Sequence, residues 1–157
     1  LQTAEAGIKE NPYQVELLHL ASEIAYRLRD SQKAEELLLQ ALETGDKTDE
    51  TLLTLSNLYL NEDKPDKAIE MISQMDEEGN PYAAWNLAQA YNELEDFDAA
   101  RTYYKQAYED LAHEPDFLKA YGLFLREDGQ LEMARTVLTN YLQQEPGDLE
   151  VQSLLEE

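Results

Sequence analysis

An alanine that returns at nearly constant intervals constrains the fold of this chain more than any other feature of its sequence. It stands at Ala34, Ala68, Ala100 and Ala134, so the intervals are 34, 32 and 34 residues. The segments around it resemble one another and read KAEELLLQAL, KAIEMISQM, AARTYYKQAY and MARTVLTNYL. An internal period of this length is typical of proteins that stack one supersecondary unit several times.

The copy over residues 84–108 indicates what the repeated unit is. Apolar side chains are spaced there by three and four residues, which places them on one face of a helix. The two faces consist of Ala84, Leu87, Ala88 and Tyr91, and then of Phe97, Ala100, Tyr104 and Ala107. We predict two helices that pack on each other through these faces, with Phe97 buried and Asp96 capping the second helix. The unit is a helical hairpin.

On these residues the chain resembles tetratricopeptide repeat proteins, and among them those of Gram-positive bacteria. Their repeat is a helix–turn–helix of 34 residues. The resemblance implies an all-α fold, a right-handed α-solenoid of about four repeats. The expected single domain, 1–157, contains the end of a preceding repeat (1–10), repeats at 13–48, 49–80, 81–114 and 115–147, and a capping or truncated helix (148–157).

The two ends of the sequence are expected to be incomplete hairpins. The chain begins at Leu1 within a helical pattern, and we interpret it as a piece of a longer protein. Asn11 and Pro12 are expected to cap and open the first complete repeat. Apolar residues in the unpaired ends favour weak association of the chain with itself; they are Leu1, Ile8, Leu149, Leu154 and Leu155.

Few side chains could support catalysis or metal binding. The chain has no cysteine, which excludes disulfides, thiol nucleophiles and thiolate ligands. We expect His19 and Glu23, four residues apart on one helix, to form a solvated or groove-lining pair rather than a metal site. The acidic loop 61–66 lacks the glycine and the glutamate of a calcium loop. We therefore predict no catalytic residue, no metal site, no cofactor and no enzyme activity.

Charge restricts the class of partner. Thirty-four acidic residues against twelve basic ones give a formal charge of −22, which repels nucleic acid and anionic lipid surfaces. No apolar run reaches the roughly 18 residues of a membrane span. We predict no nucleic-acid and no membrane partner, and a cytoplasmic location.

The resemblance also implies a binding groove, because the first helix of each repeat, helix A, lines the concave side in this family. Within one repeat, Tyr82, Trp85, Gln89 and Asn92 follow each other at helical spacing, which supports a single stripe. A tryptophan there suits a binding hot spot, and amides suit the backbone of an extended peptide. Alternatively, Trp85 packs on the neighbouring A helices at Leu53 and Lys119. The predicted groove residues are His19, Leu53, Asn57, Asn61, Tyr82, Trp85, Gln89, Asn92, Lys119 and Arg126.

Three functions remain open at this point. The first is a scaffold that binds a partner protein or peptide in the groove, and the second is a regulatory module that binds a small signalling peptide. The third is a spacer beside a domain outside this sequence. Acidic residues outnumber basic ones along the groove, so a basic or neutral segment is favoured over an acidic one; the acidic residues are Glu16, Glu23, Glu50, Glu93, Asp116 and Glu127.

Overall fold

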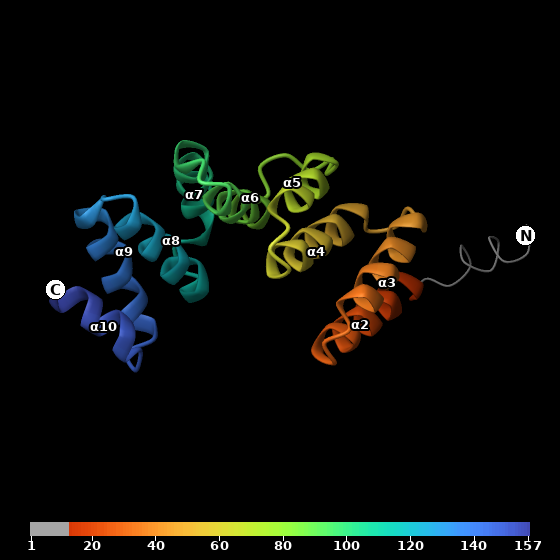
Figure 1. The fold of residues 1–157 in the computed structure, drawn as a ribbon, viewed down its shortest axis with the longest axis horizontal. Coiled ribbons are helices and arrows are strands. Elements are labelled where there is room, and N and C mark those ends of the chain that lie inside the picture. The colour runs from red at the N-terminus through yellow and green to blue at the C-terminus, as the bar shows by residue number, and fades with distance from the viewer. Residues whose placement is uncertain (1–12) are drawn as a thin grey trace, which may run out of the picture. The chain divides into compact units, whose positions relative to one another are not determined.

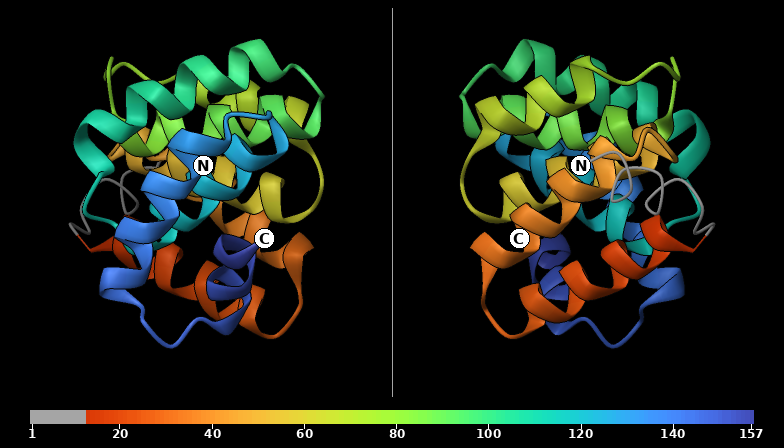
Figure 2. Two further views of the ribbon diagram at one scale, coloured as in Figure 1. Left: turned by 90° about the vertical axis from the view of Figure 1, so that its left-hand side faces the viewer. Right: turned by 90° about the vertical axis from the view of Figure 1, so that its right-hand side faces the viewer.

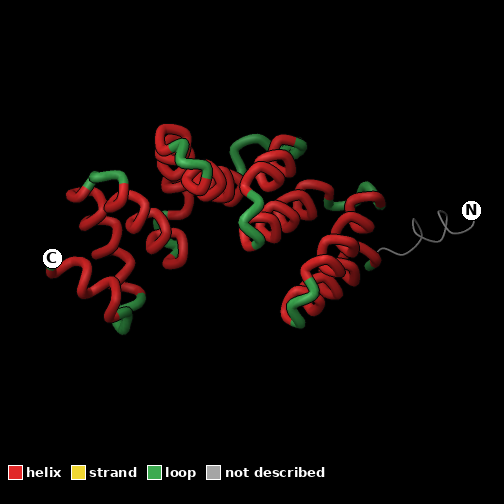
Figure 3. The backbone as a smooth tube through the Cα atoms, in the orientation of Figure 1, coloured by secondary structure: helices red, strands yellow, loops and turns green. Residues whose placement is uncertain are grey.

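The computed structural model describes residues 13–157, and all its regular elements are α-helices (Figure 3). Their bounds are α2 Gln14–Arg27, α3 Ser31–Glu43, α4 Thr48–Asn61, α5 Pro65–Ser73, α6 Pro81–Glu93, α7 Phe97–Leu111, α8 Pro115–Glu127, α9 Leu131–Gln144 and α10 Leu149–Glu156. The expected end of a preceding repeat, with Asn11 and Pro12, lies outside the described residues. Within residues 13–157, no helix combines the length and the apolar character that crossing a membrane requires.

The chain forms two compact units, which meet in sequence between Gly79 and Asn80. The first unit contains α2 to α5 and the second contains α6 to α10. Consecutive helices pair as hairpins, α2 with α3, α4 with α5, α6 with α7 and α8 with α9 (Figures 1 and 2). The predicted helix–turn–helix is therefore the building element of both units.

All four hairpins close with the same turn. One residue in each adopts a left-handed backbone, with φ between 56° and 78°; these are Arg29, Asp63, Glu95 and Gly129. The N–H of the next residue then donates to the carbonyl five positions earlier, at 2.8–2.9 Å, which satisfies an end carbonyl of helix A. The repeated geometry matches the repeated sequence.

Short polar residues and prolines define where the helices begin. Asp96 accepts a hydrogen bond from the backbone N–H of Ala99 at 3.1 Å, which confirms it as the cap of α7. Asn80 caps α6 in the same way, and Pro81 follows at the first helical position, where a missing N–H costs nothing. The second helix of each hairpin is its B helix, and α5 is the shortest of these, with nine residues. The loop after it is held by Asp49, which accepts from two of its backbone N–H groups.

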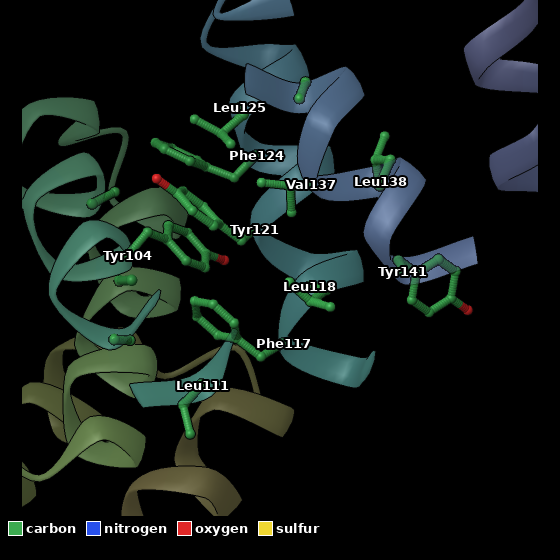
Figure 4. Close-up of a cluster of buried hydrophobic side chains, with 14 of the residues drawn as sticks. Tyr104, Leu111, Phe117, Leu118, Tyr121, Phe124, Leu125, Val137, Leu138 and Tyr141 are labelled. Carbon is green, nitrogen blue, oxygen red and sulfur yellow. The ribbon is translucent and has the colours of Figure 1, made fainter. Parts of the chain in front are cut away.

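Aromatic rings fill the core of the second unit. Figure 4 shows Tyr104 of α7 beside Phe117, Tyr121 and Phe124 of α8. The ring centre of Tyr104 lies 4.8 Å from that of Phe124 and 5.3 Å from that of Tyr121, both in stacked orientation. These contacts fix how the second hairpin of the unit packs on the first.

Small residues provide the close approach between paired helices, as the sequence predicts. Ala88 and Ala100 are fully buried between α6 and α7. At Gly122 of α8 the fit is tighter still, because a β-carbon there would lie 2.5 Å from Cγ of Leu138 on α9. The predicted burial of Phe97 is wrong, since its side chain is 45% exposed. Phe97 is the first residue of α7, beside the turn, where the paired helix does not cover it.

Candidate partner-binding site

In the first unit, a hollow lies between the A helices α2 and α4. Its volume is about 460 Å³. Three predicted groove residues, His19, Asn57 and Asn61, contribute to its lining. Its buried apolar lining, which we call its floor, consists of Ala34, Leu38 and Leu58. We call this cavity the α2–α4 hollow.

In the second unit, a smaller hollow lies between the A helices α6 and α8. Its volume is about 270 Å³, and the predicted residues Gln89 and Asn92 line it. Tyr104 and Phe124 of the aromatic core also border it. We call this cavity the α6–α8 hollow. Half of the predicted groove residues thus border one of two separate hollows, each within one unit.

Leu53, Tyr82 and Trp85 border neither hollow. Tyr82 is 43% exposed, whereas Trp85 is partly buried. The Trp85 ring meets Phe117 edge to face, with centroids 5.5 Å apart and planes at 89°. Its indole Nε1 is buried and lacks a hydrogen-bond partner among the described residues. This geometry favours the packing interpretation of Trp85, with Phe117 as its neighbour.

Lys119 and Arg126 are engaged by the last helix, α10. Lys119 Nζ lies 2.7 Å from Oδ2 of Asp148, the cap of α10. Arg126 donates to the carbonyl of Leu154 at 2.7 Å and to the carboxylate of Glu157. The bonds from Lys119, the Tyr141 hydroxyl and the Val151 N–H lower the pKa of Asp148 to about 2. Both cations therefore hold α10 in place instead of standing free for a partner.

His19 turns toward α4. Its Nε2 lies 2.8 Å from Oγ1 of Thr51, and its Nδ1 lies 3.7 Å from the Glu50 carboxylate. Glu23 instead accepts a hydrogen bond from Arg27 at 2.6 Å. His19 and Glu23 both border the α2–α4 hollow, which agrees with the expected groove-lining pair, although each has its polar partner elsewhere. No group of metal-ligating side chains occurs in residues 13–157.

Burial lowers the pKa of His19 below its ordinary 6.5, although the Glu50 and Glu16 carboxylates oppose this effect and Lys47 adds to it. The unfolded chain then binds a proton at higher pH than the folded chain. We expect stability from the neutral imidazole to be complete above pH 6.5 and to fall as the pH drops toward the lowered pKa. Urea unfolding between pH 5 and 7.5 gives the free energy of unfolding at each pH. Its increase with pH should be smaller in His19→Gln than in the unmutated chain. His113→Gln, the same substitution at a largely exposed site, is the matched control.

One surface was not predicted, an exposed apolar stripe along α2 and its two flanking residues; one member, Leu20, also lines the α2–α4 hollow. Its side chains are spaced by three and four residues and are 51% to 76% exposed. They are Tyr13, Leu17, Leu20, Ile24 and Leu28. The spacing of three and four residues between these apolar side chains is the signal in the sequence that could have found the stripe. We call this surface the α2 stripe.

Known proteins contain repeats similar to those of this chain. Residues 81–148 match the family described as "YpiA-like, C-terminal tetratricopeptide repeats". The chain is 31% identical over 157 residues to the "TPR repeat-containing protein YpiA" of Bacillus subtilis (strain 168). That alignment covers 99% of this chain and 37% of the relative, so the chain spans little more than a third of that protein's length.

Solved structures show the same fold at low identity. MamA matches with a TM-score of 0.70 over 85% of this chain and 80% of its own. PilW, described as a widely conserved type IV pilus biogenesis factor, matches at 0.72 over 90% and 69%. A chain of the APC/C hetero-tetramer Cut9-Hcn1 matches at 0.76 over 92% and 29%. Each is 19% identical to this chain, and the likeness confirms the expected all-helical repeat fold.

Proposed function

We propose that this chain, which is a tetratricopeptide repeat protein, is a non-catalytic scaffold whose A helices bind a segment of a partner protein. Repeats of this type generally mediate interactions between proteins. The observation that carries the proposal is the pair of hollows, each bordered by side-chain amides that can both donate and accept hydrogen bonds. Such groups suit the backbone of an extended segment.

Charge gives the proposed partner its character. In the first unit, the Glu50 carboxylate lies near His19. Lys47 forms ion pairs with both Glu16 and Glu50. In the second unit, Lys119 and Arg126 are already neutralised by α10. A basic or neutral segment therefore meets an acidic surface with few free cations, and its association should slow as salt rises.

Replacement of the amides tests the proposal. We expect Asn57→Ala with Asn61→Ala and Gln89→Ala to reduce capture of a partner from lysate by at least tenfold, since several hydrogen bonds of about 1 kcal/mol each are lost. Gln40→Ala with Gln106→Ala, on exposed positions of B helices, is the matched control. The captured protein must be identified, and its association rate measured over a range of salt. Capture unaffected by the triple replacement would contradict binding along the A helices.

We also propose a cytoplasmic location, because a chain without cysteine suits a reducing compartment. Cell fractionation with an antibody against the chain would test it. Recovery in the membrane or extracellular fraction would overturn this part of the proposal.

Weak self-association remains a proposal. We now propose the α2 stripe as its site in place of the apolar residues near the C-terminal end. Leu149 is 75% exposed, whereas Leu154 and Leu155 are half-buried. The α2 stripe exposes more apolar side chains on one helix and is the more suitable surface. We expect sedimentation velocity to show dimers at high concentration, and Leu17→Glu with Leu28→Glu to abolish them. Leu149→Glu is the control; monomers only in the unmutated chain would exclude the association.

A further inference from the structure

We infer that the α2–α4 hollow receives one aromatic side chain of the partner, next to a basic residue of the same segment. This inference deepens the proposed function and rests on it. It comes from comparing the two units, which place the same kind of cavity at the same position in the repeat.

The two hollows correspond residue by residue. The recurring alanine shifts from Ala34 to Ala100, so equivalent positions differ by 66 residues. Applied to the linings, this shift relates Leu38 to Tyr104 and Leu58 to Phe124. The hollows are therefore the same site of the fold with different side chains.

In the second unit, the chain's own rings take up part of this site and leave the smaller α6–α8 hollow. Tyr104 is only 3% exposed and stacks on Phe124 at 4.8 Å. It also lies 6.1 Å from Phe117 and 5.3 Å from Tyr121. The backbone of a hairpin pair thus accommodates an aromatic ring between α6, α7 and α8 without loss of close packing.

In the first unit, every one of these rings is replaced by a smaller side chain. The equivalents of Tyr104, Phe117, Tyr121 and Phe124 are Leu38, Thr51, Leu55 and Leu58. The cavity is correspondingly larger, about 460 Å³ against about 270 Å³. It has an apolar floor and opens toward solvent beside Tyr26, which is 41% exposed. A ring from a partner would find here the space that Tyr104 occupies in the other unit.

The polar rim selects what stands beside that ring. Glu23 lines the hollow, and its side chain is 55% exposed. Among the described residues it forms an ion pair with Arg27 of the same helix. The whole chain carries a charge of −22. A lysine or arginine adjacent to the aromatic residue would complement this rim, while an acidic neighbour would be repelled. Asn57 and Asn61, both exposed, stand where the backbone of the segment would pass.

Three short peptides can serve as probes of the full chain. They are acetyl-Lys-Tyr-Lys-amide, acetyl-Lys-Ala-Lys-amide and acetyl-Glu-Tyr-Glu-amide, titrated against protein with labelled alanine and leucine methyl groups. We expect the first to bind at least tenfold more tightly than either of the others. Ring-current shifts should appear at the methyl groups of Ala34 and Leu58, and not at Ala100 or Leu118 of the second unit. Equal binding of the tyrosine and alanine peptides would overturn the inference.

Filling the hollow from inside provides the matched variants. Leu38→Phe copies the aromatic residue of the second unit and should weaken the first peptide at least tenfold while leaving the helical content unchanged. Leu39→Phe makes the same substitution at the next, 41% exposed position of α3 and should bind like the unmutated chain. Leu58→Phe, the equivalent of Phe124, serves if Leu38→Phe does not fold. A folded filling variant that binds as the unmutated chain does would also overturn the inference.

The same variants separate this inference from the proposed function. If Leu38→Phe still captures a partner that the amide triple replacement loses, the scaffold function stands and the aromatic site is wrong. If the tyrosine peptide shifts Ala34 and Leu58 while no protein is captured, the site stands and the scaffold function is wrong.

Discussion

Replacing Trp85 by alanine is expected to lower the free energy of unfolding by about 3 kcal/mol, the lower end of the range for removal of a large packed aromatic. The ring is partly buried and meets Phe117 edge to face, and Phe117 itself is fully buried. Its loss would expose Phe117 and leave a cavity beside the aromatic core. Chemical unfolding followed by circular dichroism measures this difference.

The control for Trp85 is Tyr82→Ala, one turn earlier on α6. Tyr82 is 43% exposed, and its removal should change the free energy of unfolding by less than about 1 kcal/mol. If Trp85→Ala unfolded at the same denaturant concentration as the unmutated chain but lost an identified partner, the hot-spot interpretation would replace the packing one.

Gly122→Leu should destabilise the second unit by about 3 kcal/mol or more, at the upper end of the effects of overpacking. Even a β-carbon at this position would come within 2.5 Å of Leu138 Cγ. Leu138 is almost fully buried and cannot move away without displacing its neighbours. We expect Ala100→Leu to act in the same direction, because Ala100 is fully buried between α6 and α7. Thermal melts of each variant give the comparison.

Gly147→Leu is the matched control for Gly122→Leu. A β-carbon there meets nothing within 4 Å, so the same substitution adds side-chain volume in open space. Its melting should remain close to that of the unmutated chain. Equal melting of Gly122→Leu and Gly147→Leu would mean that α8 and α9 do not approach as the structure describes.

The elements that the sequence predicted well are those governed by local chemistry. Asp96 caps α7 because a short carboxylate before a helix accepts from its free N–H groups, wherever the rest of the chain lies. The buried alanines follow from spacing alone. The prediction that Phe97 is buried was wrong. Residue spacing indicates which face of a helix is apolar, but it does not indicate where the paired helix ends.

The candidate site was predicted less completely, because its contacts join residues far apart in the sequence. His19 finds Thr51, 32 positions away, rather than Glu23 four positions away. Lys119 is held by Asp148, which belongs to a helix whose place a repeat pattern does not give. The difference in volume between the two hollows depends on which rings fill one space from two helices, and only the packed structure shows it.

The left-handed turns of the four hairpins have a consequence for which residues can stand at their tips. A left-handed backbone favours glycine, yet only Gly129 is one; Arg29, Asp63 and Glu95 adopt the same geometry at a cost of about 1–2 kcal/mol each. The packing of the two helices therefore imposes the turn, and the residue at its tip does not decide it. Since a cation, an aspartate, a glutamate and a glycine occupy equivalent tips, the charge at each turn can vary between related sequences while the hairpin stays the same.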